Sequence, residues 1–186
     1  MKKLFIAVAL ILSSVVSVGS STNTKNIENV WTYQSYTTMM ADREKQHECL
    51  AKNIYFEARN EPFVGQFAVA LVTLNRVHDS AFPNTICDVV YEGIHTASGF
   101  PKRDRCQFSW YCDGKGDEPR PTPAWKDSVE IAEYIIRTPS LLDITDGATH
   151  YHADWMEKFP KWAHQKKKLV KIDTHIFYKK RNNFNF

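Results

Sequence analysis

Two apolar segments early in the chain predict two helices separated by a polar break. Within residues 47–58, Leu50, Ile54 and Glu57 fall at i, i+4 and i+7. Glu57 therefore lies about 20° from Leu50 around the helix axis, on or beside the apolar stripe. Residues 63–77 are apolar almost all the way round, which indicates a helix central to the core. A carboxylate is thus expected at an unusually apolar place.

The polar break between these helices contains Asn60, Glu61 and Pro62. Asn60 suits the left-handed backbone that ends many helices, and Pro62 suits the start of the next one. A carboxylate at a helix start is favoured by the helix dipole, so Glu61 has a structural explanation that Glu57 lacks. Gly65 costs about 1 kcal/mol of helix propensity, which indicates that another backbone packs closely there.

The rest of the chain adds one clear helix and two strand-like segments. Residues 82–93 begin with turn residues and continue into a short apolar segment. Apolar residues recur with helical spacing over residues 122–138, where Thr122 is placed to cap the helix. Residues 148–155 and 168–180 alternate and carry β-branched and aromatic side chains, which predicts strands. The fold class is α+β, mainly helical, with a small sheet late in the chain.

The N-terminal residues predict export. Residues 1–20 place Lys2 and Lys3 before an apolar run and small residues, the pattern of a signal peptide, and the run is too short to favour a permanent span. The alternative is an uncleaved N-terminal anchor. Residues 21–45 are polar without a clear period and read as a linker or loose arm, so the folded domain is expected over 46–186. The mature protein is expected in the periplasm, at the cell wall or outside the cell, with no stable membrane span.

An even number of cysteines in an oxidising compartment predicts two disulfides. The four residues, Cys49, Cys87, Cys106 and Cys112, allow three pairings, and the sequence does not choose among them. Pairing Cys106 with Cys112 closes a short loop and leaves Cys49 with Cys87, and we carry this pairing as a hypothesis. A catalytic Cys106 working with a histidine is the alternative, but a free thiolate in that compartment is prone to oxidation.

Charge and composition further restrict the class of protein to which this chain can belong. Aromatic residues make up 13% of the 186 residues, which argues against disorder and indicates a surface that stacks on a ligand. Residues 157–186 hold eight Lys and one Arg against one Glu and one Asp, a net charge of +7 in a chain of net +3. Such a region is attracted to polyanions such as a cell wall, an outer leaflet or nucleic acid, or it is simply a solvated face.

Glu57 is the first candidate for chemistry. A carboxyl group on an apolar helix face has a raised pKa and holds a proton near neutral pH. A protonated carboxyl group donates to the leaving oxygen in glycoside cleavage. The structural alternative is an ion pair of Glu57 with Arg59 or Arg76.

Two further groups of residues suggest a binding site. Gln107 and Ser109 lie among aromatic residues in CQFSWYCDG, a mixture that binds sugar rings, although the aromatics of a disulfide-closed loop also fill cores. In a strand, His150 and His152 share one face and Tyr151 takes the other. The two histidines could ligate zinc, but a lone H-x-H is a weak signal, and a Tyr or His lining a groove is the better interpretation. Phosphate-loop, G-x-S-x-G and dinucleotide motifs do not occur.

These stretches, in this order, resemble the cell wall hydrolase family of the spore cortex-lytic enzyme type. The motifs are ECLAKNIYFEARNEPFVGQFAVALVTLNRV, FPNTICDVVYE, CQFSWYCDG, GATHYHADW and KIDTHIFY, and they cover roughly residues 47–178. The family usually has glycine at the position of Asn60. The resemblance implies a lysozyme-like domain that cuts peptidoglycan between N-acetylmuramic acid and N-acetylglucosamine, with Glu57 as the catalytic residue of a lytic transglycosylase. No cofactor and no metal are expected.

The remaining expectations concern supporting residues, partners and alternatives. Glu61, Gln107, Ser109, Tyr151 and His152 are the candidate supporting or groove-lining residues. The expected partner is peptidoglycan and not nucleic acid, and the expected state is a monomer. The alternatives are a zinc-dependent amidase or peptidase acting on the same polymer, and a non-catalytic glycan-binding module. Lyase or hydrolase chemistry, and wall remodelling or phage lysis, stay open.

Overall fold

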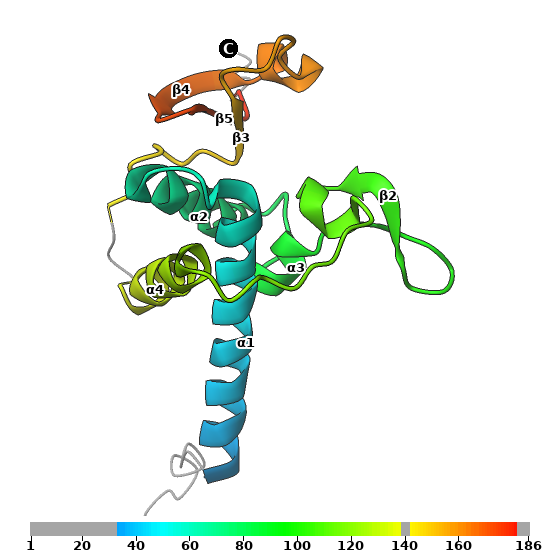
Figure 1. Ribbon diagram of the computed structural model, residues 1–186, viewed down its shortest axis with the longest axis vertical. Coiled ribbons are helices and arrows are strands. Elements are labelled where there is room, and N and C mark those ends of the chain that lie inside the picture. Colours follow the sequence, from blue (N-terminus) through cyan, green and yellow to red (C-terminus); the bar gives the residue numbers. More distant parts are fainter. Residues whose placement is uncertain (1–32, 139–141, 182–186) are drawn as a thin grey trace, which may run out of the picture.

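Three helices form the body of the protein: α1 (Tyr33–Ala58), α2 (Phe63–His78) and α4 (Pro123–Arg137). The structure is a computed structural model that describes residues 33–138 and 142–181. In Figure 1, α2 crosses the C-terminal end of α1 and α4 lies beside it. The three helices share one core cluster, whose buried members are Leu50, Ala51, Ile54, Ala70, Ile131, Ala132 and Ile135. The sequence-predicted helices are confirmed, including the cap of α4, where the Thr122 hydroxyl accepts from the Trp125 N–H.

A smaller unit lies on the opposite side of α1 from α4 (Figure 1). It consists of the short helix α3 (Ile86–Val90), the hairpin of β1 (Gly93–His95) and β2 (Pro101–Cys106), and the 3-10 turn η2 (Ser109–Cys112). Its buried residues are Val89, Val90, Phe108 and Trp110. The hairpin was not predicted, because β2 reads PKRDRC and is mostly exposed, so it shows no alternation of apolar and polar residues.

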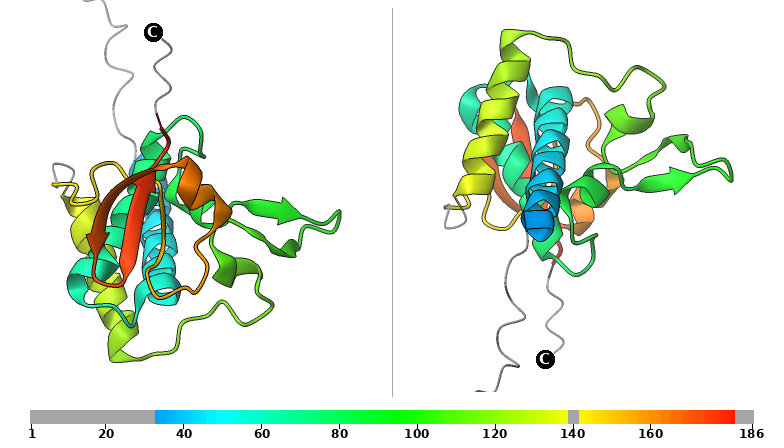
Figure 2. Two further views of the ribbon diagram at one scale, coloured as in Figure 1. Left: turned by 90° about the horizontal axis from the view of Figure 1, so that it is seen from above. Right: turned by 90° about the horizontal axis from the view of Figure 1, so that it is seen from below.

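A three-stranded antiparallel sheet covers α2 on the side away from α4 (Figures 1 and 2). Its strand order is β3 (His150–Ala153), β5 (His175–Lys179), β4 (Lys167–Ile172), and the 3-10 turn η3 (Lys161–Gln165) precedes β4. The sheet packs on α2 through a cluster of buried residues, Ala68, Val72, Ala148 and Phe177. The predicted late sheet and the α+β class are therefore confirmed.

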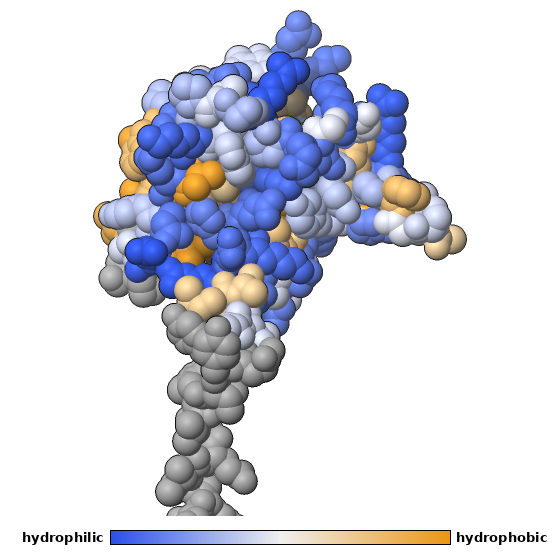
Figure 3. Space-filling model, turned by 60° about the horizontal axis from the view of Figure 1, so that its bottom comes forward, coloured by the Kyte–Doolittle hydropathy of each residue, from blue (hydrophilic) through white to orange (hydrophobic). Residues whose placement is uncertain are grey.

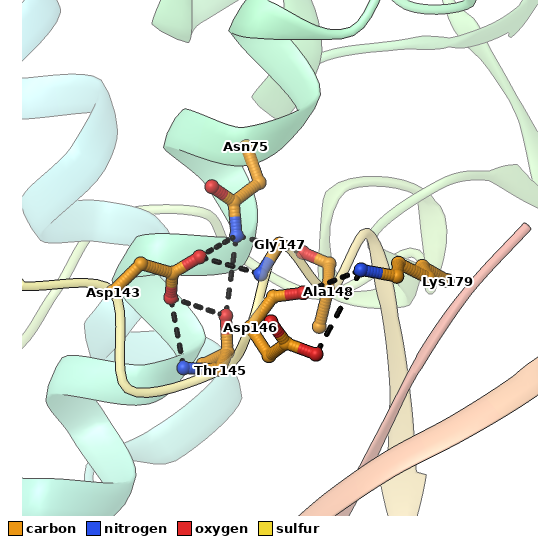
Figure 4. A network of polar contacts seen from close by, with 7 residues as sticks. All are labelled: Asn75, Asp143, Thr145, Asp146, Gly147, Ala148 and Lys179. Carbon is orange, nitrogen blue, oxygen red and sulfur yellow. Dashed lines mark hydrogen bonds and ion pairs between the residues drawn. The ribbon is translucent and has the colours of Figure 1, made fainter.

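The segment that leads into β3 is tied to α2 by a polar network (Figure 4). The Asn75 side-chain N–H donates to Asp143 at 3.0 Å, to the Thr145 hydroxyl at 3.2 Å and to the Ala148 carbonyl at 3.0 Å. Asp143 in turn accepts from the backbone N–H groups of Thr145 at 2.8 Å and Gly147 at 2.7 Å. One amide on α2 therefore sets where β3 begins, and with it the position of the β3 side chains.

The N-terminal part of the described chain differs from expectation. Residues 33–45, expected to belong to a linker or loose arm, form the first half of α1, which projects from the body in Figure 1. Residues 38–45 are exposed, and burial begins at Gln46. The predicted signal peptide, residues 1–20, lies outside the described residues. None of the described helices is both long and apolar enough to cross a membrane.

The end of α1 also differs in one detail. The helix ends at Ala58, as predicted, and the Glu61 N–H donates to the Ala58 carbonyl at 2.9 Å. Asn60 lies in the turn but does not take the left-handed backbone that we expected, since it is not among the described residues with positive φ. An asparagine is therefore accommodated here without glycine-like geometry. The face of the molecule seen in Figure 3 is mostly hydrophilic, with small, separate hydrophobic areas.

Candidate active site

Glu57, in the last turn of α1, lines a cavity of about 970 Å³. The walls come from the end of α1, from η2 and the loop after it, and from the start of α4. The lining residues are Tyr55, Phe56, Glu57, Arg59, Ser109, Trp110, Asp113, Lys115, Gly116, Glu118, Arg120, Thr122, Pro123 and Ala124. Ser109 and the aromatic Trp110 therefore share the cavity with Glu57, as the sequence interpretation of this loop as a sugar site requires.

The Glu57 carboxyl group is held at one oxygen. The Tyr151 hydroxyl donates to Oε2 at 2.8 Å, from β3 to the end of α1. Burial raises the pKa of Glu57, and the Tyr151 hydrogen bond and the charge of Arg76 oppose that rise only in part. Among the described residues Glu57 makes no ion pair within 4.0 Å, so the structural alternative of a pair with Arg59 or Arg76 is not what the structure shows.

Arg76 is the buried cation behind Glu57. It is 5% exposed, its Nε donates to the Thr149 carbonyl at 2.8 Å, and its guanidinium lies 4.7 Å from the centre of the Phe108 ring. Its Nη1 atom is buried without a hydrogen-bond partner. No carboxylate of the described residues forms an ion pair with Arg76. Its positive charge therefore affects the pKa of Glu57 from a distance, without a direct contact.

Glu92 is a second carboxyl group near Arg76 that sequence reasoning missed. Its Oε2 atom is buried without a partner, and burial raises the pKa of Glu92, opposed by the charge of Arg76. A signal was present in the chain, since Glu92 directly follows the apolar residues 89–91 and Arg76 is the one charged residue within 63–77. Nothing in the sequence joins these two residues, because they lie 16 positions apart in different elements.

Trp110 is fixed in the cavity wall by a buried amide. The Trp110 indole N–H donates to the Asn53 side-chain oxygen at 3.0 Å, and the Asn53 amide donates to the Thr73 hydroxyl at 3.0 Å. The Phe56 ring stacks on Trp110, with 4.6 Å between ring centroids. The aromatic wall is therefore held by α1 and α2, the helices that also position Glu57 and Arg76.

Glu61 points away from Glu57 and joins the sheet. The Thr174 hydroxyl donates to its Oε1 at 2.7 Å, and His175 Nδ1 lies 3.9 Å from its Oε2. A Cβ at Gly65 would lie 2.8 Å from the Asp173 carboxylate and 2.9 Å from the Glu61 Cβ. The close packing predicted at Gly65 is therefore present, but side chains make it and not another backbone.

The other candidate residues fall into two groups, those that lie near Glu57 and those that do not. Tyr151 contacts Glu57, whereas His152 packs on the opposite face of the sheet, where its Nε2 lies 3.0 Å from the Tyr178 hydroxyl and its ring centroid lies 4.4 Å from that of Phe159. Gln107 is exposed and does not line the Glu57 cavity. The structure therefore brings Ser109 and Tyr151 to Glu57, and neither Gln107 nor His152.

The two histidines of β3 share a face, as predicted, but that face is packed with aromatic rings. The centroid of Trp162 lies 5.3 Å from His150 and 5.8 Å from His152. Burial lowers the pKa of His150 to about 4, and the charges of Lys166 and Arg76 add to the effect. In residues 33–138 and 142–181, no group of three or more His, Cys, Asp or Glu is arranged to hold a metal ion.

Both expected disulfides are present. Cys49 is bonded to Cys87, which ties α1 to α3, and Cys106 is bonded to Cys112, which closes the loop that carries Ser109. The hypothesis on the pairing is confirmed, and no described cysteine is free. A thiol nucleophile at Cys106 is therefore not what the structure shows.

A mainly helical α+β domain that presents a carboxyl group of raised pKa on the wall of a large cavity has the features of an enzyme. The chain belongs to the cell wall hydrolase family, since the family's profile, described as Cell Wall Hydrolase, matches residues 60–178. Glu57 lies three residues before the matched range, so this match does not include it.

Solved structures and curated relatives agree with this assignment. The catalytic domain of the SleB protein of Bacillus cereus is 31% identical with a TM-score of 0.53, covering 73% of this chain and 91% of that domain. The catalytic domain of the germination-specific lytic transglycosylase SleB of Bacillus anthracis is also 31% identical, with a TM-score of 0.54 over 73% of this chain and 95% of that domain.

Two curated proteins match over a shorter stretch. The spore cortex-lytic enzymes of Bacillus cereus and Bacillus subtilis (strain 168) are each 49% identical over 45 residues, which is 24% of this chain. The matched stretch spans 17% and 15% of those proteins' own lengths. The family is therefore established over residues 60–178 of this chain.

Proposed function

We propose that this protein is a lytic transglycosylase that cuts the glycan strands of peptidoglycan between N-acetylmuramic acid and N-acetylglucosamine. The observation that carries the proposal is Glu57, whose pKa is raised by burial on the wall of a cavity of about 970 Å³. A carboxyl group of raised pKa beside Trp110 and Ser109 suits the protonation of a glycosidic oxygen held against an aromatic wall. The SleB relative described as a lytic transglycosylase supports the same reaction class.

The reaction needs one carboxyl group in two protonation states. Protonated Glu57 donates its proton to the glycosidic oxygen as the bond to the muramic anomeric carbon breaks. The Glu57 carboxylate then accepts the proton of the muramic C6 hydroxyl, whose oxygen bonds to the same anomeric carbon. The products are a strand with a new N-acetylglucosamine end and a 1,6-anhydromuramic end, and Glu57 regains its proton. The attack is intramolecular, so no water is consumed.

Two further carboxylates line the cavity, and each already has a cationic partner. Asp113 lies 3.2 Å from Lys115, and the Lys115 backbone N–H, which donates to it, is the main reason why the pKa of Asp113 is lowered. Glu118 lies 3.1 Å from Lys52 and its side chain is 86% exposed. A retaining or inverting glycosidase needs a second carboxyl group on the other side of the scissile bond from the acid. Asp113 and Glu118 are instead engaged in ion pairs with lysines.

The test is mass spectrometry of muropeptides released from purified peptidoglycan. Wild-type protein is expected to release anhydromuramic ends, and Glu57→Gln, which keeps the shape but carries no titrating proton, is expected to lose at least about 10²-fold in rate. Asp113→Asn and Glu118→Gln are the matched controls and are expected to keep most of the activity. Reducing muramic ends would establish a hydrolase, and loss of activity in Asp113→Asn or Glu118→Gln would assign that residue as the second carboxyl group.

Two other readings give different results in the same measurement. A zinc amidase or peptidase releases peptides and intact glycan and is stopped by a chelator. A glycan-binding module binds peptidoglycan and releases nothing. Two disulfides in a member of this family indicate a place of action outside the cytoplasm, and we propose the periplasm or cell wall, with the protein acting as a monomer.

A further inference from the structure

A second pocket adjoins the Glu57 cavity, and Arg59 lines both. It encloses about 420 Å³ between the start of α2 and one face of α4, and we call it the α2–α4 pocket. Its lining residues are Arg59, Glu61, Phe63, Gln66, Asp127, Glu130, Ile131 and Tyr134. If the Glu57 cavity is the reaction site, a ligand in the α2–α4 pocket therefore lies next to the glycan strand that is cut.

One wall of the α2–α4 pocket is aromatic and open to solvent. Phe63 is 59% exposed and Tyr134 is 53% exposed, although both are large rings. Phe67 lies between them, with its ring centroid 5.9 Å from that of Phe63 and 6.3 Å from that of Tyr134. The exposed rings are thus backed by a third ring, which gives an ordered apolar surface suited to an alkyl chain or to a cation over a ring face.

The charge on the lining is negative and incompletely paired. Asp127 is exposed and has no described partner, and Glu130 has only the exposed Lys126 at 3.6 Å. Arg59 does not neutralise them, because its guanidinium lies 5.0 Å from the centre of the Tyr55 ring and its Nη1 donates to the Tyr55 carbonyl at 3.3 Å. The pocket therefore favours a positively charged ligand.

Gln66 adds an unused hydrogen-bond acceptor. Its side chain is only 7% exposed, and its Nε2 donates to the Glu61 carbonyl at 3.0 Å. Its Oε1 is buried without any hydrogen-bond partner among the described residues. A buried acceptor left unsatisfied costs about 1–3 kcal/mol, and a ligand that brings an N–H group into the pocket would remove that cost.

We propose that the α2–α4 pocket binds an aliphatic primary amine, and that its ligand is the amine-bearing diamino acid side chain of a peptide stem attached to the strand being cut. The ammonium group sits between Asp127 and Glu130, and its alkyl part lies on Phe63 and Tyr134. The identity of the stem as ligand rests on the proposed function, since stems lie beside the glycan only if the Glu57 cavity holds a glycan strand.

The kinetic test compares three soluble substrates: strands with free stem amines, strands whose stem amines are acetylated, and strands without stems. For free-amine strands, the double variant Asp127→Asn/Glu130→Gln is expected to raise KM about three- to tenfold with little change in kcat. Acetylation is expected to raise the KM of the wild-type protein by the same factor and to leave that of the variant unchanged. Asp104→Asn, in the hairpin on the far side of α1 (Figure 1), is the matched control.

Two results would overturn the proposal. One is an equal loss in the double variant on all three substrates, which would mean that the pocket contacts the sugar chain. The other is an unchanged KM on free-amine strands. A binding measurement separates this proposal from the proposed function, because it requires no cleavage. Calorimetry with a synthetic stem peptide should show binding that is lost in the double variant and in the N-acetylated peptide, and equal binding of both peptides would contradict the assignment.

Discussion

At the residue scale, Glu57 is defined by how few groups stabilise its charged form. One oxygen accepts from Tyr151, Arg76 acts from a distance, and burial outweighs both. In the proposed reaction, Glu57 has to hold a proton and then lose it within one cycle. Its environment, rather than the residue type, makes it suitable, because Glu61 lies four residues on and has the same chemistry with different contacts.

Tyr151→Phe tests how the pKa of Glu57 is set. The hydroxyl donates to the carboxylate and so favours the charged form, and its removal raises the pKa of Glu57 further. Since the first step needs the protonated acid, the alkaline limb of the kcat/KM profile is expected to move to higher pH.

Tyr178→Phe is the matched control, because the Tyr178 hydroxyl meets His152 on the other face of the same sheet. It is expected to leave the limb in place. A limb that does not move in Tyr151→Phe, or that moves to lower pH, would contradict the assignment of that limb to Glu57.

Glu57→Gln is expected to stabilise the protein at neutral pH. The pKa of Glu57 is raised in the folded state, so ionisation opposes folding above the unfolded-state pKa, increasingly as pH rises through the folded-state pKa. Each unit by which a pKa is raised costs about 1.4 kcal/mol, and 1 kcal/mol changes Tm by roughly 2–4 °C in a domain of this size. Thermal unfolding should show a higher Tm for the variant at pH 7 and equal Tm values near pH 4. A lower Tm at pH 7 would show that Tyr151 and Arg76 outweigh burial.

At the element scale, the disulfides link elements that also pack against each other. Cys49–Cys87 closes a separation of 38 residues between α1 and α3, and Cys106–Cys112 closes one of 6. Loop-closure entropy makes the first worth about 4 kcal/mol and the second about 2 kcal/mol. Denaturant unfolding of Cys49→Ala/Cys87→Ala and of Cys106→Ala/Cys112→Ala should show losses in that order. The reverse order would mean that Cys106–Cys112 contributes more to the free energy of unfolding than Cys49–Cys87.

The elements also show what the sequence reveals and what it hides. Periodicity predicted α2, α4 and the end of α1, because these helices bury a continuous apolar face. It missed the β1–β2 hairpin and the first half of α1, since both are exposed and have no apolar pattern. Glu57 was singled out as the candidate because one carboxylate interrupts an apolar stripe, and the structure places it on a cavity wall. Two features have no local sequence pattern, because they depend on how the helices meet in space. One is the position of Arg59 in the walls of both cavities, and the other is the position of Glu92 near Arg76.

At the scale of the whole molecule, cations gather at one edge of the sheet. Lys167 and Lys179 are paired across β4 and β5, and Lys180 is near enough to Lys166 to contribute to lowering its pKa, after burial. Lys179 has an ion pair with Asp146, whereas Lys166, Lys167 and Lys180 have none among the described residues. These lysines of the +7 region therefore lie together at one sheet edge, an arrangement consistent with attraction to an anionic polymer.

Replacing Lys166, Lys167 and Lys180 by Gln tests this surface. Each cation near an anionic surface contributes about 1 kcal/mol at low salt, so attachment to insoluble wall material that carries anionic polymers should weaken at least about tenfold. Cleavage of soluble strands should not change, and added salt should abolish the difference between variant and wild type. Sedimentation with the wall material measures attachment. Equal sedimentation of the variant and the wild type at low salt would show that these lysines only keep the surface solvated and do not bind the wall.

The unbroken α1 has a mechanical consequence. One helix runs from the projecting residues 33–45 to Glu57, over about 36 Å at 1.5 Å per residue. A load on the projecting half would travel along this rod, but Cys49 is covalently tied to Cys87 about two turns before Glu57. Part of a pull on residues 33–45 would therefore pass through this bond into α3 before it reached Glu57.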